Sequence, residues 1–303
     1  MVTSAGVRSV VVAHTSRANA NLYMPTFLDT DTTLDTFRRE VDPARRDIDL
    51  ARAHLTLAEY EYPALPPEAS LLSLDELAMR AEAALGANKI GALDLARFLF
   101  RVEGFGPNTA DPSDPRNSFL SEVLLRRLGI PITLSVIYLE VARRVGVQAQ
   151  GIGLPGHFII SAAGDGDRAP VYIDPYGGVP ISVEDCIARV SDITGGRLAW
   201  RPAFLDPVGP RYILTRILNN LKNAYAARND SERAARIVER LLVLNPQDGG
   251  EWRSLGLLFA GLGQRRRAIG ALEQFVALSP PTEDATAARK LMNQLAGQIA
   301  RLN

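Results

Sequence analysis

Residues 131–175 decide the fold of this chain, and they read PITLSVIYLEVARRVGVQAQGIGLPGHFIISAAGDGDRAPVYIDP. From Ile130 to Val145 apolar residues recur at spacings of three and four, which places them on one buried stripe of a helix. Pro131 suits the first helical turn, because an N–H group there has no partner within the helix. We therefore expect a central helix from Pro131 to Val145, ended by Gly146.

Two short segments with strand character follow this helix, at residues 157–163 and 170–174. Between them lie Gly164, Asp165, Gly166 and Asp167, so the pattern predicts a β-hairpin. Folding the hairpin about the centre of this loop brings His157 opposite, or nearly opposite, Asp174. A carboxylate in that position fixes the tautomer of the imidazole ring and favours its protonated form.

Three segments of the chain resemble the bacterial SirB-like family: DPRNSFLSEVLLRRLGIPITLSVIYLEVARRVGV (Asp114–Val147), LPGHF (Leu154–Phe158) and IDPYGG (Ile173–Gly178). Proteins of that family join a transglutaminase-like domain, a branch of the papain-like cysteine enzymes, to C-terminal tetratricopeptide repeats. The resemblance covers about residues 45 to 300. It implies an α+β papain/transglutaminase-like domain with a small antiparallel sheet, followed by an all-α tetratricopeptide-repeat domain.

The resemblance also implies a nucleophilic cysteine at the start of the central helix, about fifteen residues before the glycine that ends it. The helix dipole and the histidine would stabilise its thiolate there. Counting back along this chain instead reaches Pro131, Ile132 and Thr133. Thr133 and Ser135 are hydroxyls, which a helix terminus does not acidify enough to make nucleophiles. The histidine and aspartate pair is thus left without the third member of a triad.

We interpret His157 and Asp174 as a remnant catalytic pair that borders a pocket; the alternative is a structural hydrogen bond that braces the hairpin. Further candidates for the pocket lining are Asn117, Ser118, Thr133, Ser135 and Tyr176. Asn117 also suits the N-cap of a helix predicted at residues 119–128, and Tyr176 has simple packing as an alternative. A histidine earlier in the chain, His54, is expected at a helix surface or at a packing edge.

Cys186 is the only thiol, in the segment ISVEDCIARV. Ser182 and Asp185 form a capping box for a helix that starts at Val183, and Cys186 takes a position that packs against Ile181. Packing therefore explains this cysteine, whereas a relocated nucleophile would need an exposed, electropositive setting. A single cysteine excludes an internal disulfide, and three scattered histidines do not suggest a metal site, so we expect no metal and no other cofactor.

The predicted organisation has four parts. They are a weakly ordered N-terminal segment at 1–43 with a short helix near 34–41, a transglutaminase-like domain at 44–195, a Gly- and Pro-rich linker at 196–210 and helical repeats at 211–303. Helices at 47–60, 73–85 and 92–102 are expected to cover one side of the central helix.

The C-terminal part repeats with a period of 34 residues, which is typical of tetratricopeptide repeats. Matching pairs are Leu221 and Leu255, Tyr225 and Phe259, Ala234 and Ala268, Leu244 and Leu278, and Pro246 and Pro280. Two repeats are fewer than such arrays need on their own, so we expect a capping helix near 283–302 and contact with the first domain. The array either binds a protein partner or only buttresses that domain.

Composition limits the classes of partner and the cellular location that we expect. Thirty-four basic residues balance 34 acidic ones, so no overall field attracts nucleic acid or an anionic membrane. The N-terminal apolar run Val10–Val12 is too short for a signal-peptide core, and no run of 18 apolar residues occurs. We expect a cytoplasmic protein.

The sequence favours a non-catalytic, degenerate transglutaminase-like protein that binds a protein or peptide partner in a scaffolding or regulatory role. The alternative is an active amide-bond hydrolase or acyl transferase that uses His157 and Asp174 with an unconventional nucleophile or an activated water. A third possibility is an assembly factor recognised only through its repeats. The oligomeric state is open.

Overall fold

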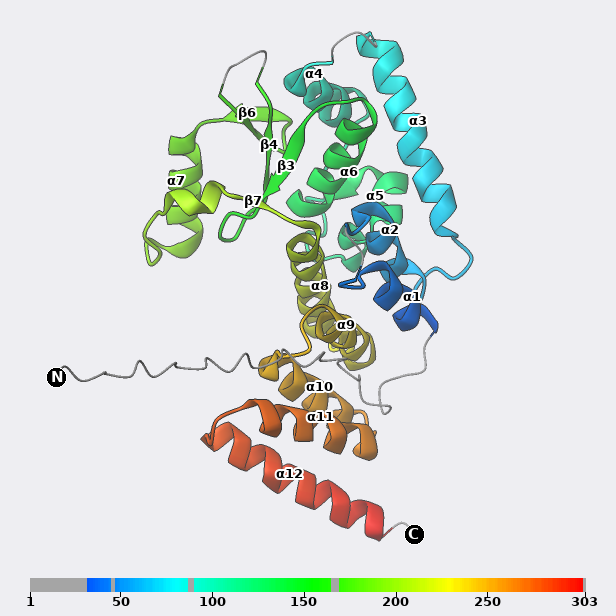
Figure 1. Cartoon of the computed structure of the whole chain (residues 1–303), viewed down its shortest axis with the longest axis vertical. Helices are drawn as coiled ribbons and strands as arrows, with labels where there is room; N and C mark the ends of the chain where they lie inside the picture. The colour runs from blue at the N-terminus through cyan, green and yellow to red at the C-terminus, as the bar shows by residue number, and fades with distance from the viewer. Residues whose placement is uncertain (1–31, 45–46, 87–89, 165–168, 302–303) are drawn as a thin grey trace, which may run out of the picture.

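A computed structural model describes residues 32–44, 47–86, 90–164 and 169–301 (Figure 1). Most of the predicted N-terminal segment and the centre of the hairpin loop, Asp165 to Asp167, lie outside these residues. The short helix predicted near 34–41 is present as α1 (Thr32–Glu40), with Leu34 and Phe37 buried. The division of the chain at residues 43, 195 and 210 stays a prediction.

The predicted central helix is α6 (Pro131–Arg144), and most of its residues are buried. Other helices pack around it: α2 (Leu50–Leu55), α3 (Pro67–Leu85), α4 (Ala92–Arg97) and α5 (Leu120–Arg126). Short helical turns connect them: η1 (Thr56–Ala58), the π-helical turn η2 (Phe98–Val102) and η3 (Pro115–Ser118). Figure 1 shows α6 between this group of helices and the strands.

Two predictions about these helices are wrong. The helix expected from Ser73 begins at Pro67, whose proline ring is compatible with a first helical turn. The helix expected at 47–60 is shorter, because α2 passes into the tight turn η1 after Leu55. Since α2 is buried on nearly all sides, His54 is completely buried and does not lie at a surface or at a packing edge.

The predicted antiparallel sheet is confirmed, and it has more strands than the predicted hairpin. Its order is β6 (Val179–Ile181), β5 (Val171–Asp174), β4 (Ile159–Ala162), β3 (Ala149–Ile152) and β7 (Pro207–Val208). The hairpin is the pair β4 and β5, with Ile160 opposite Ile173. A separate two-stranded pair joins β1 (Gly106–Pro107) to β2 (Leu128–Gly129) in parallel.

The segment predicted as a linker takes part in the sheet. It forms the helical turn η4 (Pro202–Leu205) and the edge strand β7, which pairs with β3. Before it, α7 (Val183–Thr194) begins with the predicted capping box. The Ser182 hydroxyl accepts a hydrogen bond from the Asp185 N–H at 3.0 Å, and the Asp185 carboxylate accepts from the Ser182 N–H at 2.8 Å.

The C-terminal helices have the predicted repeat arrangement. The pair α8 (Pro210–Ala227) and α9 (Ser231–Leu244) is followed by α10 (Gly249–Gly261) and α11 (Arg265–Leu278), and α12 (Glu283–Ala300) closes the array. These helices run from the middle to the bottom of Figure 1.

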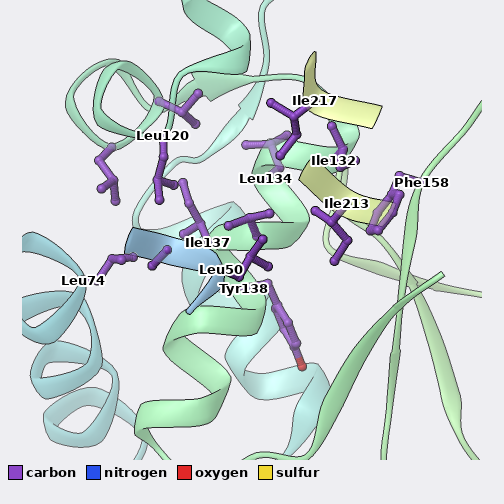
Figure 2. Packing of buried hydrophobic residues seen from close by; sticks show 14 of the residues in the cluster. Leu50, Leu74, Leu120, Ile132, Leu134, Ile137, Tyr138, Phe158, Ile213 and Ile217 are labelled. Carbon is purple, nitrogen blue, oxygen red and sulfur yellow. The ribbon is translucent and has the colours of Figure 1, made fainter. Parts of the chain in front are cut away.

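The first repeat shares a hydrophobic core with the transglutaminase-like part. Ile213 and Ile217 of α8 belong to one buried cluster with Ile132 of α6 and with Phe158, as Figure 2 shows. A second cluster joins α9 to α10, α11 and α12 around Trp252. Because the first core is continuous, α8 and α9 support the transglutaminase-like part directly, as a buttress would.

Candidate functional site

A cavity of about 300 Å³ lies where α8 meets the transglutaminase-like part. The start of α6 contributes an apolar wall of Ile130, Pro131 and Ile132. Ser118 at the end of η3 and His157 in the loop before β4 add polar groups. Pro131 and Ile132, two of the three residues at which the resemblance would place a cysteine nucleophile, thus line the same cavity as His157.

A left-handed glycine sets the position of His157. Gly156 has φ +73°, and a β-carbon on it would lie 2.3 Å from Cγ2 of Ile193 in α7. Only glycine fits this close approach without strain. The turn then places His157 two residues before β4, at the border of the cavity.

Arg189 of α7 brings His157 and Asp174 together. Its Nη1 atom lies 2.6 Å from Nε2 of His157 and 2.5 Å from Oδ2 of Asp174. The direct separation between His157 Nε2 and Asp174 Oδ1 is longer, at 3.5 Å. The two residues of the predicted pair are thus neighbours, but an arginine that the sequence analysis did not identify mediates their contact.

The Asp174 carboxylate is buried and strongly favoured in its charged form. Burial by itself raises the pKa of Asp174, but His157, the Tyr176 N–H and Arg189 lower it by more, to about 2. The Tyr176 N–H donates to Oδ1 at 3.0 Å. Asp174 therefore stays an anion and holds the guanidinium of Arg189 in place.

Asn117 lies in η3, is not part of the cavity lining and is not the N-cap of α5. Its Oδ1 accepts from Asn108 and Arg126, each at 3.0 Å, and its Nδ2 donates to the Asp111 carbonyl at 2.9 Å. Phe119 takes the N-cap position instead. The amide of Asn117 therefore has partners for both of its ends and holds the loop that carries Ser118.

Two further contacts fix the backbone beside Ser118. The Thr133 hydroxyl donates to the Asn117 carbonyl at 2.8 Å, and Nε2 of His54 bonds to the Ser118 carbonyl at 2.8 Å. Burial lowers the pKa of His54 to about 4, although that hydrogen bond opposes the effect. His54 is thus a neutral donor, and it positions one wall of the cavity from outside.

The remaining candidates lie in different surroundings. Ser135 is fully buried in α6, and its hydroxyl has no hydrogen-bond partner among the described residues. Tyr176 is 41% exposed and meets the His157 ring edge-on, with the ring centroids 6.0 Å apart. Of the residues predicted to line a pocket, Ser118 reaches this cavity, whereas Asn117, Thr133, Ser135 and Tyr176 are not part of its lining.

The lone thiol lies in an apolar cluster apart from the cavity. Cys186 is fully buried with Ile152, Leu154, Ile159 and Val190. Burial raises the pKa of its thiol. No hydrogen bond joins Cys186 to His157 in the part of the chain that the structure describes, so the packing role predicted for this residue is retained.

Arg189 and Arg216 were missed by the sequence analysis. The signal for Arg189 is its spacing on α7, since it lies three residues after the buried Cys186 and next to the buried Val190. Arg216 lies beside the buried Ile217 on α8 and donates to the Leu154 carbonyl at 2.8 Å. Among 31 arginines, neither stands out by residue type.

The described residues also bear on metals and membranes. They contain no group of three or more His, Cys, Asp or Glu side chains placed to hold a metal ion. Within the same ranges, every helix is too short or too polar to cross a bilayer.

Comparisons with known proteins match both parts of the chain. Residues 68–219 match the model of the transglutaminase-like superfamily, and residues 221–295 match a tetratricopeptide repeat model. A UPF0162 protein of Xylella fastidiosa is 40% identical over 192 residues, which cover 62% of this chain and 68% of that protein. A UPF0162 protein of Pseudomonas aeruginosa is 28% identical over 239 residues, or 78% of this chain and 87% of that protein.

A human protein, F-box only protein 21, is 34% identical over 89 residues, which cover 27% of this chain and 14% of that protein. This match is too partial to carry more than a local likeness. The superfamily model, in contrast, covers half of the chain, and the resemblance to the SirB-like family is confirmed. The chain therefore belongs to the transglutaminase-like superfamily and, within it, to the UPF0162 proteins, with tetratricopeptide repeats after the first domain.

Proposed function

We propose that this protein is a non-catalytic member of its superfamily that binds a protein or peptide partner in a scaffolding or regulatory role. One observation carries the proposal. The cavity that contains His157 meets the start of α6 at Pro131 and Ile132, neither of which can act as a nucleophile. Tetratricopeptide repeats generally bind proteins, which supports a partner as the ligand.

The partner surface is either the cavity or the outer repeat helices. One face of the first repeat is buried against the transglutaminase-like part, and this favours a supporting role for α8 and α9. On the outer helices, Arg253 of α10 pairs with Asp284 of α12 at 2.9 Å, while both side chains remain partly exposed. The cavity contains polar groups that lack hydrogen-bond partners, so we favour it as the binding site.

A test compares the full chain with its His157→Ala variant in two assays. One follows ammonia release from glutaminyl peptides, and the other follows incorporation of a labelled primary amine into them. We expect both proteins to give the background rate. Turnover by the unmodified chain that the variant lacks would refute the proposal.

A second candidate function is amide-bond hydrolysis or acyl transfer with Ser118 as the nucleophile. The observation in its favour is that the Ser118 side chain and His157 line one cavity. Against it, no hydrogen bond links the Ser118 hydroxyl to the imidazole among the described residues, and a serine needs such a base to attack an acyl group. Loss of turnover in both Ser118→Ala and His157→Ala would support this candidate.

A further inference from the structure

The cavity contains polar hydrogens without acceptors. Arg216 uses Nη1 to donate to the Leu154 carbonyl at 2.8 Å, and no carboxylate of the described residues forms an ion pair with it. Its guanidinium carbon also lies 5.9 Å from the centre of the Phe158 ring, and its other N–H groups have no acceptor among the described residues. The Ser118 hydroxyl also lacks a partner in the described part of the chain, although its residue is 3% exposed. Both groups can donate to an acceptor in the cavity.

The charge of the cavity is positive. Asp114 is the one carboxylate in its lining, but Arg116 and Arg126 neutralise it at 2.8 Å and 3.5 Å. Its pKa is lowered because these arginines outweigh the effect of burial. Arg216 therefore remains without a carboxylate partner among the described residues, which favours an anionic ligand.

Arg189 determines which nitrogen of His157 carries a proton. A guanidinium has only donors, so the 2.6 Å contact of Nη1 with Nε2 requires an unprotonated Nε2. With Nε2 accepting from Arg189, Nδ1 is the ring nitrogen that carries the proton. Nδ1 has no hydrogen-bond partner among the described residues. It is also not among their fully buried polar atoms without a partner, so it is accessible in a residue that lines the cavity.

We propose that this cavity binds a carboxylate group of a peptide through Arg216, Ser118 and the Nδ1–H of His157, and that Arg189 is the positioning residue that keeps that proton on Nδ1. The inference rests on the proposed binding function and names its ligand chemistry. Asn220 and Asn223 follow Arg216 on the same face of α8, and their amides suit the peptide groups next to the carboxylate. A proton on Nδ1 also prevents that nitrogen from acting as a base toward the cavity.

Four small probes test the ligand chemistry on the full chain. The α-amides of N-acetylglutamate and N-acetylglutamine differ only in a side-chain carboxylate, and N-acetylglycine and its amide differ only in a terminal one. Affinities are measured from the NMR shifts of the His157 ring. We expect at least one carboxylate to bind about tenfold more tightly than its amide, since charge-assisted hydrogen bonds are the strong ones.

Variants assign this preference to the cavity. Arg216→Gln should abolish the preference, whereas Arg253→Gln, which removes an arginine from α10, should leave it intact. A preference for the glutamate compound alone identifies an acidic side chain as the source, and a preference for N-acetylglycine alone identifies a chain terminus. Equal affinity for acids and amides, or no binding of either at millimolar concentration, overturns the inference.

The role of Arg189 is tested by the ¹⁵N resonances of His157, which distinguish the two neutral tautomers. The proton should lie on Nδ1 in the unmodified chain and move to Nε2 in Arg189→Met, with loss of the carboxylate preference. Arg189→Lys retains a donor and should keep the first tautomer in part. A proton on Nε2 of the unmodified chain would contradict the inference. Ammonia release from the glutamine probe would instead refute the proposed function, so the two failures are distinguishable.

Discussion

A β-carbon on Gly156 would lie 2.3 Å from Cγ2 of Ile193, so the turn before His157 is fitted against α7. Arg189 lies one helical turn before Ile193, and it reaches the imidazole of the next residue in the turn, His157. The close approach between the loop before β4 and α7 therefore fixes the positions of both His157 and Arg189.

Gly156→Ala should destabilise the protein by about 2 to 4 kcal/mol, because it adds backbone strain to a steric clash. Gly146→Ala is the matched control. Gly146 has φ +78°, but a β-carbon there meets nothing within 4 Å, so only the strain of about 1 kcal/mol applies. Denaturant unfolding measures the loss of stability in both variants. Equal losses in the two variants would show that the contact with Ile193 is unimportant.

Stability should fall on acidification through the titration of His54. Its pKa is 6.5 in the unfolded chain and about 4 in the fold, so between these values the unfolded chain binds a proton that the native state does not. The contribution of neutral His54 to the free energy of unfolding is fully present above pH 6.5 and is lost progressively as the pH falls toward 4. The loss amounts to about 3 kcal/mol.

The control for this prediction is His54→Gln, which retains a donor for the Ser118 carbonyl but does not titrate. The free energy of unfolding, measured from neutral pH down to pH 4, should fall less steeply in the variant. Parallel curves for the two proteins would assign the acid sensitivity to other groups.

The continuity of the first core predicts long-range effects of substitutions in α8. Ile217→Ala should cost about 2 to 5 kcal/mol and should reduce hydrogen-exchange protection in α6, because both helices share one buried cluster. Phe259→Ala in the second cluster should reduce protection mainly in α10 to α12. Unchanged protection of α6 in Ile217→Ala would argue that the two parts unfold independently.

Cys186 should behave as a packed apolar residue. A thiol reagent should label it only as fast as the protein opens, because its side chain is fully buried. Cys186→Ser should be less stable than Cys186→Ala by about 1 to 3 kcal/mol, since the hydroxyl would be buried without a partner. Rapid labelling of the native protein would instead indicate an accessible, reactive thiol.

Local patterns in the sequence predicted most of the architecture. The stripe of α6, the capping box at Ser182 and the 34-residue period each depend on neighbours in sequence, and each corresponds to an observed element. The edge strand β7 was missed because two residues, one of them proline, carry no alternation.

The site was harder to predict, because long side chains from distant elements complete it. His157 and Asp174 were found from the hairpin, but Arg189 reaches them from α7, and arginine is too common in this chain to attract notice. His54 was misplaced because α2 stops after Leu55 and is buried nearly all round, so helical periodicity no longer separates an inner face from an outer one.

Intact-mass spectrometry after incubation with excess of a reactive acyl donor tests the central claim most directly. The claim is that the cavity beside His157 contains no competent nucleophile, so no acyl adduct that depends on His157 should form. A stoichiometric acyl adduct on Ser118 or Cys186 that disappears in His157→Ala would contradict it.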